Sequence, residues 1–107
     1  MLPRYKLQRV TDYINDNLRD DLTLGKMSAT LSMSPFHFAH AFRQATGLAP
    51  HRYVIQRRVE RAKLLLRETD LSITEIAHLV GYSNQSNFSA VFHRVTGHTP
   101  RSYRSEA

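Results

Sequence analysis

The chain contains one pattern of residues twice, and this repeat restricts its fold more than any other feature. The segment FRQATGLAPHRY, residues 42–53, returns as FHRVTGHTPRSY, residues 92–103, with Phe, Thr-Gly, Pro and Tyr at identical spacing. The apolar residues upstream recur as well: Leu22, Leu24, Met27 and Leu31 match Leu71, Ile73, Ile76 and Val80, each 49 residues on. The chain therefore holds two copies of one structural unit.

Apolar residues follow one another at helical spacing throughout the chain, and no segment alternates as a strand would. The expected buried stripes are Leu7, Val10, Ile14 and Leu18; Leu24, Met27 and Leu31; Phe38, Phe42 and Ala45; Ile55, Val59, Ala62 and Leu66; Ile73, Ile76 and Val80; and Phe88, Val91, Phe92 and Val95. The pattern predicts an all-α protein of about seven helices, the first running from Arg4 to Leu18.

Start and stop signals divide these helices. The predicted N-caps are Thr23 and Ser34, the latter followed by a proline in the first turn. Ser72 and Glu75 form a capping box, Ser-x-x-Glu, ahead of the next apolar run. Helix ends are predicted at Gly47 and Gly97, and Pro50 opens a long helix between the copies.

Each copy therefore reads as a short helix, a tight turn and a second helix, which is the helix-turn-helix layout. Two helices that cross steeply need a small residue where they touch and a break at the turn. The second copy supplies Ala77 and Gly81, and the first supplies Ser28 and Ser32 as weaker matches. One such copy alone is better explained as a plain αα-hairpin, the commonest use of two short helices. The duplication on a basic chain favours helix-turn-helix motifs.

The net charge of +6 is unevenly distributed along the chain. Residues 1–21 balance four bases against four acids, whereas residues 39–67 hold seven bases and the single acid Glu60. Such an excess favours a polyanionic partner, a nucleic acid rather than an anionic membrane surface, and the alternative is a basic surface that is merely solvated. The chain has no cysteine, so a disulfide framework and a thiolate metal site are excluded. No apolar run reaches the roughly 18 residues of a membrane span, and the start resembles no signal peptide.

Several segments of the sequence resemble those of a known protein family. The segment ITEIAHLVGYSNQSNFSAVFHRVTGHTPRSYR closely resembles the second helix-turn-helix of the AraC/XylS transcriptional regulators. RRVERAKLLLRETDLSI is similar to the linker-helix segment of that family, and LTLGKMSATLSMSPFHFAHAFRQATGLAPHRY resembles the first motif. The resemblance covers the chain from about Leu7 to Arg104.

The resemblance implies one DNA-binding domain over residues 1–107, with two homeodomain-like helix-turn-helix subdomains at about 4–50 and 69–107. A long linker helix, residues 51–68, would join them. Each second helix would enter the major groove of duplex DNA, about one turn apart. The expected activity is transcriptional regulation in the bacterial cytoplasm, usually activation through RNA polymerase, without a cofactor.

Most members of the family also carry a separate effector-binding or dimerisation domain, typically N-terminal. Two arrangements are open: a small stand-alone regulator, or the DNA-binding half of a longer protein. We expect the second, because LPRYKLQRVTDYINDNL resembles the start of that half.

The candidate DNA-contacting residues follow from the buried stripes and from the family. In the second helix of the first motif, some positions face away from the buried phenylalanines and can reach a groove. The base contacts predicted there are Phe36, Ala39, His40 and Arg43. Phe36 either touches a thymine methyl or packs against the neighbouring turn. In the second helix of the second motif, the candidates are Gln85, Ser86, Asn87 and Ala90. Gln85 and Asn87 can each form two hydrogen bonds with adenine.

Phosphate contacts are expected from short donors at helix N-termini and from basic side chains near them. The candidates are Thr23, Ser34, His37, Arg57, Arg58, Ser72, Ser83, His93 and Arg101, with Arg61 and Arg104 as further basic residues. Some of these arginines are expected to pair with acids such as Glu60.

Other functions find less support in the sequence. His37 and His40 lie three residues apart on a helix, but no third metal ligand lies nearby, and neither paired buried carboxylates nor a glycine-rich phosphate loop is present. A targeting module of a DNA-repair alkyltransferase would need its catalytic cysteine outside these residues. A helical protein-interaction bundle is the remaining alternative, and its DNA binding would depend little on salt.

Overall fold

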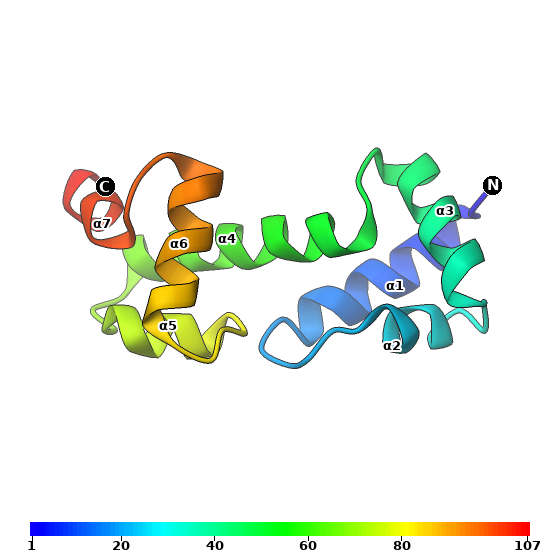
Figure 1. Cartoon of the computed structure of the whole chain (residues 1–107), viewed down its shortest axis with the longest axis horizontal. Coiled ribbons are helices and arrows are strands. Elements are labelled where there is room, and N and C mark those ends of the chain that lie inside the picture. Colours follow the sequence, from blue (N-terminus) through cyan, green and yellow to red (C-terminus); the bar gives the residue numbers. More distant parts are fainter. The chain divides into compact units, whose positions relative to one another are not determined.

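The computed structural model describes all 107 residues, which form seven α-helices and no strands (Figure 1). The helices are α1 (Arg4–Asp16), α2 (Leu24–Ala29), α3 (Pro35–Thr46), α4 (Pro50–Glu68), α5 (Ile73–Leu79), α6 (Gln85–Thr96) and α7 (Pro100–Glu106). The prediction of an all-α protein with seven helices is confirmed.

The chain divides into two units, Met1–Val54 and Ile55–Ala107. The boundary falls inside α4, which begins in the first unit and continues without a break into the second. Each unit has a hydrophobic core of its own, as expected for two copies of one structure.

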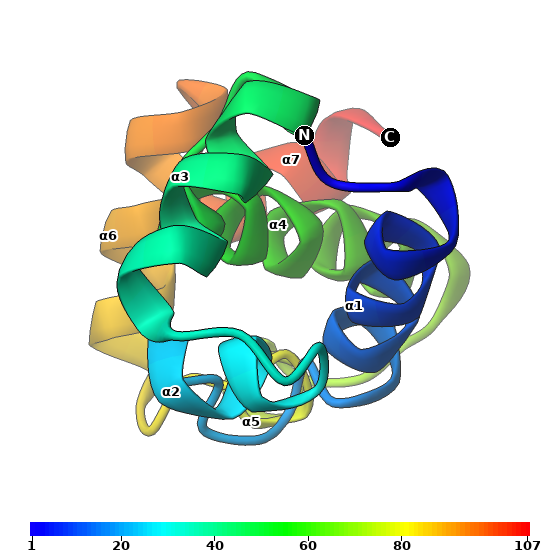
Figure 2. The same ribbon diagram turned by 90° about the vertical axis from the view of Figure 1, so that its right-hand side faces the viewer.

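In the first unit, α1 and the opening turn of α4 pack with the pair α2 and α3, and α3 crosses α2 rather than running alongside it (Figure 2). Its buried core consists of Leu2, Val10, Ile14, Leu18, Met27, Leu31, Phe38, Phe42 and Val54. The two phenylalanines are fully buried, so α3 is fixed with one face inward and the opposite face in solvent.

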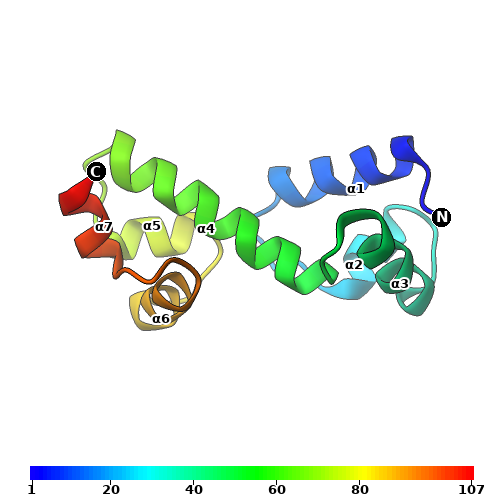
Figure 3. The same cartoon turned by 90° about the horizontal axis from the view of Figure 1, so that it is seen from above.

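The second unit repeats this arrangement with α4 in the place of α1 (Figure 3). Its buried core consists of Val59, Ala62, Leu66, Ile76, Ala77, Val80, Phe88 and Phe92. The C-terminal α7 lies near the end of α4, where Arg67 Nη1 donates to the Tyr103 hydroxyl at 2.6 Å.

The helix ends confirm the predicted capping residues. Thr23 accepts a hydrogen bond from the Lys26 amide, and Ser34 accepts one from the His37 amide. The capping box of Ser72 and Glu75 is complete in both directions. At the other end, α3 and α6 stop at Gly47 and Gly97, whose φ values of 82° and 80° are left-handed.

The turns inside the two motifs also follow the prediction, with one difference in quality. Ser28 and Ala77 are both buried, each on the first helix of its motif. Gly81 has a φ of 100°, whereas Ser32 at the matching turn takes a φ of 55°, a left-handed value that costs a residue with a Cβ free energy. The first copy therefore makes the same turn with a strained residue.

The prediction of burial is wrong for three residues of the expected stripes. Ala45 is exposed, Leu24 is 39% exposed and Val95 is 47% exposed. Ala45 and Val95 lie in the last turn of α3 and α6, beyond the reach of their short partner helices. A helix of six or seven residues is only about 10 Å long, whereas α3 and α6 extend about 18 Å.

The end of α1 also differs from the expectation, because the helix stops at Asp16 rather than at Leu18. Asn17 Nδ2 donates to the Tyr13 carbonyl oxygen at 2.8 Å, so its side chain competes with the backbone for the helical acceptor. Leu18 is nevertheless buried, 3% exposed, in the core of the first unit.

The repeated Thr-Gly pair has a structural role in both units. The hydroxyl of Thr46 lies 2.9 Å from the Phe42 carbonyl oxygen and accepts a hydrogen bond from the Leu48 amide at 3.1 Å. Thr96 does the same, at 2.8 Å from the Phe92 carbonyl oxygen and 3.1 Å from the His98 amide. The threonine thus ties the last turn of the helix to the loop that follows the glycine.

Candidate nucleic-acid interface

The outer face of α3 carries the first group of predicted base-contacting residues. His40 and Arg43 are exposed on this helix, opposite the buried Phe38 and Phe42, and Ala39 is half-buried. Both polar side chains can donate hydrogen bonds to the acceptor edge of guanine or to phosphate. The structure therefore leaves these side chains accessible to a partner.

Phe36 is the most exposed aromatic residue of the chain. The residue is 78% exposed, and its one ring contact is with His37, edge to face with centroids 5.9 Å apart. Packing against the neighbouring turn, one of the two roles considered for Phe36, is not what the structure shows. An exposed aromatic ring at the start of α3 is available for apolar contact with a partner, such as a thymine methyl.

The outer face of α6 carries the second group. Gln85, Ser86, Asn87 and Ala90 are all exposed, while Phe88 on the inner face is buried. Asn84, which the sequence analysis did not identify, caps the helix by accepting a hydrogen bond from the Asn87 amide at 2.8 Å. An asparagine directly before a helical stripe is a recognised cap signal, so the sequence did contain it.

Gln85 has a neighbour that the sequence analysis also missed. The hydroxyl of Thr74, in the first turn of α5, donates to the amide oxygen of Gln85 at 2.8 Å. The two residues are eleven positions apart in the chain, and both are exposed. No local sequence pattern links them, because the contact exists only once α5 and α6 pack together.

The predicted short phosphate donors all lie on accessible surface. Thr23, Ser34 and Ser72 use their hydroxyl oxygens to accept first-turn amides, which leaves the hydroxyl hydrogens of Thr23 and Ser72 able to donate. His37 lies beside Ser34, with Nδ1 3.0 Å from the serine Oγ. Ser83 is exposed, and its carbonyl oxygen is 3.1 Å from His78 Nε2, which braces the turn before α6.

Arg57 and Arg58 on α4 are half-buried, and both interact within the chain. The guanidinium carbon of Arg58 lies 5.6 Å from the centroid of the Tyr82 ring, a cation–π placement. Burial raises the pKa of the Tyr82 phenol above its usual value, although the positive charge of Arg58 partly opposes this. Arg58 thus supports the turn before α6, and its phosphate contact stays a prediction.

The two C-terminal arginines differ in their surroundings. Arg101 is exposed on α7, as a phosphate donor should be. Arg104 instead points its guanidinium at the end of α4, with Nε 3.2 Å from the Leu66 carbonyl oxygen and Nη2 3.3 Å from that of Thr69. The structure therefore gives Arg104 a place in the fold, since it satisfies two carbonyl groups at the C-terminal end of α4.

Positive charge is shared evenly by the two units. Met1–Val54 holds seven basic and four acidic residues, and Ile55–Ala107 holds eight and five, so each carries a net charge of +3. Glu60 pairs with Lys63, at 3.4 Å, a lysine that was not among the arginines expected to pair with it. Each unit is thus individually suited to a polyanion.

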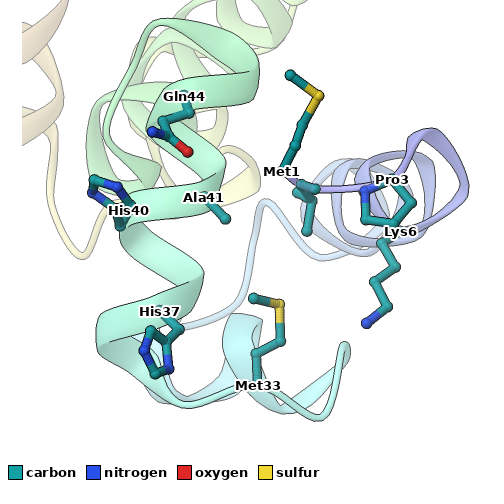
Figure 4. Close-up of a pocket in the computed structure, with 9 residues that line it drawn as sticks. Met1, Pro3, Lys6, Met33, His37, His40, Ala41 and Gln44 are labelled. Carbon is teal, nitrogen blue, oxygen red and sulfur yellow. The ribbon is translucent and has the colours of Figure 1, made fainter.

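A shallow pocket of about 320 Å³ lies beside α3 in the first unit (Figure 4). Residues of the chain start, including Met1 and Pro3, form one wall, and His37, His40 and Gln44 of α3 form another. The two histidines therefore border both this pocket and the outer face of α3.

No helix of the chain combines the length and apolar character that crossing a bilayer requires, and no group of three potential metal ligands gathers in the structure.

Comparison with known proteins agrees with this geometry. A family model described as a helix-turn-helix domain matches residues 27–106. The chain belongs to the AraC-type helix-turn-helix family of DNA-binding transcriptional regulators. The resemblance stated from the sequence is thereby confirmed, together with the fold that it implied.

Relatives of this AraC-type domain are bacterial regulators. The uncharacterised HTH-type transcriptional regulator YdiP of Escherichia coli is 38% identical over 94 residues, which cover 88% of this chain and 31% of YdiP. The chain spans less than half the length of the other curated relatives compared.

Solved structures of the family superpose closely on the chain. The C-terminal domain of the response regulator AraT from Geobacillus stearothermophilus has a TM-score of 0.91 at 33% identity, covering 95% of this chain and 85% of that one. The DNA-binding domain of the global transcriptional factor AdpA, solved in complex with a target DNA, has a TM-score of 0.90 at 30% identity, covering 94% and 91%.

Proposed function

We propose that this AraC-type domain binds an asymmetric duplex site, with α3 reading one major-groove segment and α6 reading the next. The observation that carries the proposal is the duplicated motif, whose second helices expose different side chains in the two copies. The outer face of α3 exposes aromatic and basic side chains, namely Phe36, His40 and Arg43. The outer face of α6 exposes amide, hydroxyl and methyl groups, from Gln85, Ser86, Asn87 and Ala90. Two unlike reading helices in one chain call for two unlike half-sites.

Base contacts are assigned to the outer faces of α3 and α6, and backbone contacts to the residues around them. The exposed hydroxyls at the starts of α2, α3 and α5 and the basic side chains of α4 and α7 are suited to phosphate, which fixes the register of a protein on DNA. The net charge of +3 on each unit supports binding by both units.

A regulator that contains this domain would act in the bacterial cytoplasm, where the chromosome lies. Activation through RNA polymerase, and control by an effector-binding or dimerisation domain in a longer chain, are the arrangements that we propose for the whole protein. The transcriptional role of relatives such as YdiP supports this proposal, and it argues against an enzymatic role for the domain itself.

The dependence of the DNA affinity on salt concentration tests whether the domain binds DNA through its basic surface. Fluorescence anisotropy of a labelled duplex, titrated at several salt concentrations, gives the slope of log affinity against log salt. Contacts to roughly six to ten phosphates predict a slope of about −5 to −9. A slope near zero for the tightest duplex would refute the proposal and favour a protein-interaction bundle.

A further inference from the structure

We infer that Thr74 biases the base preference of Gln85 by favouring the orientation in which the side-chain amide oxygen faces α5. The inference rests on the proposed function, in which Gln85 meets a base edge. The Thr74 hydroxyl on α5 donates to the Gln85 amide oxygen at 2.8 Å, so the bond joins the two helices of the second motif at their exposed surface.

The consequence follows from the chemistry of the amide group. A glutamine amide has an oxygen that accepts and an NH₂ group that donates. Bidentate recognition of adenine uses both, because the oxygen receives the N6 amino group while the NH₂ donates to N7. With its oxygen turned to Thr74, Gln85 presents its NH₂ group to the groove and acts as a donor.

A donor reads acceptors in the major groove. Guanine offers two, O6 and N7, whereas adenine offers N7 beside its own N6 donor, and cytosine offers only a donor. The Thr74–Gln85 pair therefore favours guanine over adenine at the position that Gln85 reads. This differs from the adenine contact expected from the sequence, where Gln85 was considered without a partner.

The first motif lacks the corresponding pair. Gly25 occupies the position that matches Thr74, since each directly follows the first residue of its short helix, and Pro35 occupies the position that matches Gln85. Neither residue has a side-chain donor or acceptor. The effect is therefore confined to one half of the site.

Substitution of Thr74 by valine and by serine separates the hydroxyl from the shape of the side chain. Thr74→Val keeps the branched form and removes the donor, while Thr74→Ser keeps the donor. The measurement is competition binding with duplexes carrying each of the four bases at every position of the α6 half-site. We expect the guanine-to-adenine preference at one position to fall about 2- to 10-fold in T74V, as one neutral hydrogen bond implies, and to persist in T74S.

A double-mutant comparison shows whether Thr74 acts through Gln85. In a Gln85→Ala background, T74V is expected to leave the base preference unchanged. If T74V weakened all sequences alike, or still shifted the preference without Gln85, the positioning role would be wrong. Thr74→Ala, checked for folding by thermal unfolding, repeats the test with both the hydroxyl and the γ-methyl group removed.

The design distinguishes failure of this inference from failure of the proposed function. If Q85A relaxes the preference at one position while T74V leaves it intact, only the role of Thr74 is refuted. If the parent domain shows no sequence preference, or Q85A changes no position, the base contact of Gln85 is refuted and the inference falls with it.

Discussion

The ring of Phe92 meets the ring of Tyr103 edge to face, with centroids 5.6 Å apart and planes at 76°. Phe42 and Tyr53 form the same pair in the first unit, at 5.2 Å and 84°. In both units the phenylalanine belongs to the second helix of the motif, and the tyrosine belongs to the helix that follows it. The repeated spacing of Phe and Tyr in the sequence is therefore the signature of one packed corner, built twice.

Removing either phenylalanine ring should destabilise its unit strongly, because both rings are fully buried. Phe42→Ala and Phe92→Ala are each expected to lower the free energy of unfolding by about 3–5 kcal/mol. A small domain has only about 5–15 kcal/mol in total. Urea or thermal unfolding followed by circular dichroism measures the change.

Val95→Ala is a suitable control for these variants, since Val95 lies on the same helix as Phe92 and is 47% exposed. Its effect should stay within about 0.5 kcal/mol. Parent-like unfolding of both phenylalanine variants would show that the inner faces of α3 and α6 are wrongly assigned.

The turn residues Ser32 and Gly81 give opposite predictions. Ser32 has a φ of 55°, a left-handed value, so Ser32→Gly should relieve strain and stabilise the first unit by about 0.5–1 kcal/mol. Gly81 has a φ of 100°, so Gly81→Ala should destabilise the second unit by about 1–2 kcal/mol. Shifts in unfolding temperature of the same sign for both variants would contradict this account of the turns.

Arg101 and Arg104 should separate binding from stability. Arg104→Ala removes two hydrogen bonds to the end of α4 and should cost about 1–3 kcal/mol in unfolding. Arg101→Ala should leave stability unchanged, weaken binding of all duplexes alike and reduce the salt slope by about 1. Unfolding curves and anisotropy titrations of both variants test this, and the opposite assignment of effects would be evidence against it.

Base-contact variants on the two reading helices should act on separate half-sites. Asn87→Ala on α6 is expected to relax base preference in one half-site by about 1–3 kcal/mol, if the asparagine contact is bidentate. Arg43→Ala on α3 should affect the other half-site only. Competition binding with singly substituted duplexes measures both. An equal effect of both variants on one half-site would contradict the assignment.

Local features of the fold were predictable from sequence because they depend on neighbouring residues. Ser34 caps α3 and Gly47 ends it, as their positions before and after an apolar stripe indicated. The exposure of Val95 was not predictable in this way, since its helical period matches that of Phe88. What decides its exposure is the length of the partner helix, a tertiary property.

In the candidate interface, too, local features were predictable from the sequence and contacts between helices were not. Exposure of His40 and Arg43 followed from the period of the buried phenylalanines and is found in the structure. The contact of Thr74 with Gln85 and the capping of α4 by Arg104 join residues 11 and up to 38 positions apart. Such pairs form through packing of whole helices, so periodicity and capping signals carry no trace of them.

Selection of bound duplexes from a random pool, using this domain as a monomer and sequencing the products, tests the central claim most directly. Helix-turn-helix proteins that dimerise read palindromes with half-sites about one helical turn apart. Two unlike copies in one chain, pointing in the same chain direction, predict instead an asymmetric site. We expect two different boxes about 10 base pairs apart, centre to centre. A palindromic consensus, or a single box, would contradict the claim that α3 and α6 read DNA side by side.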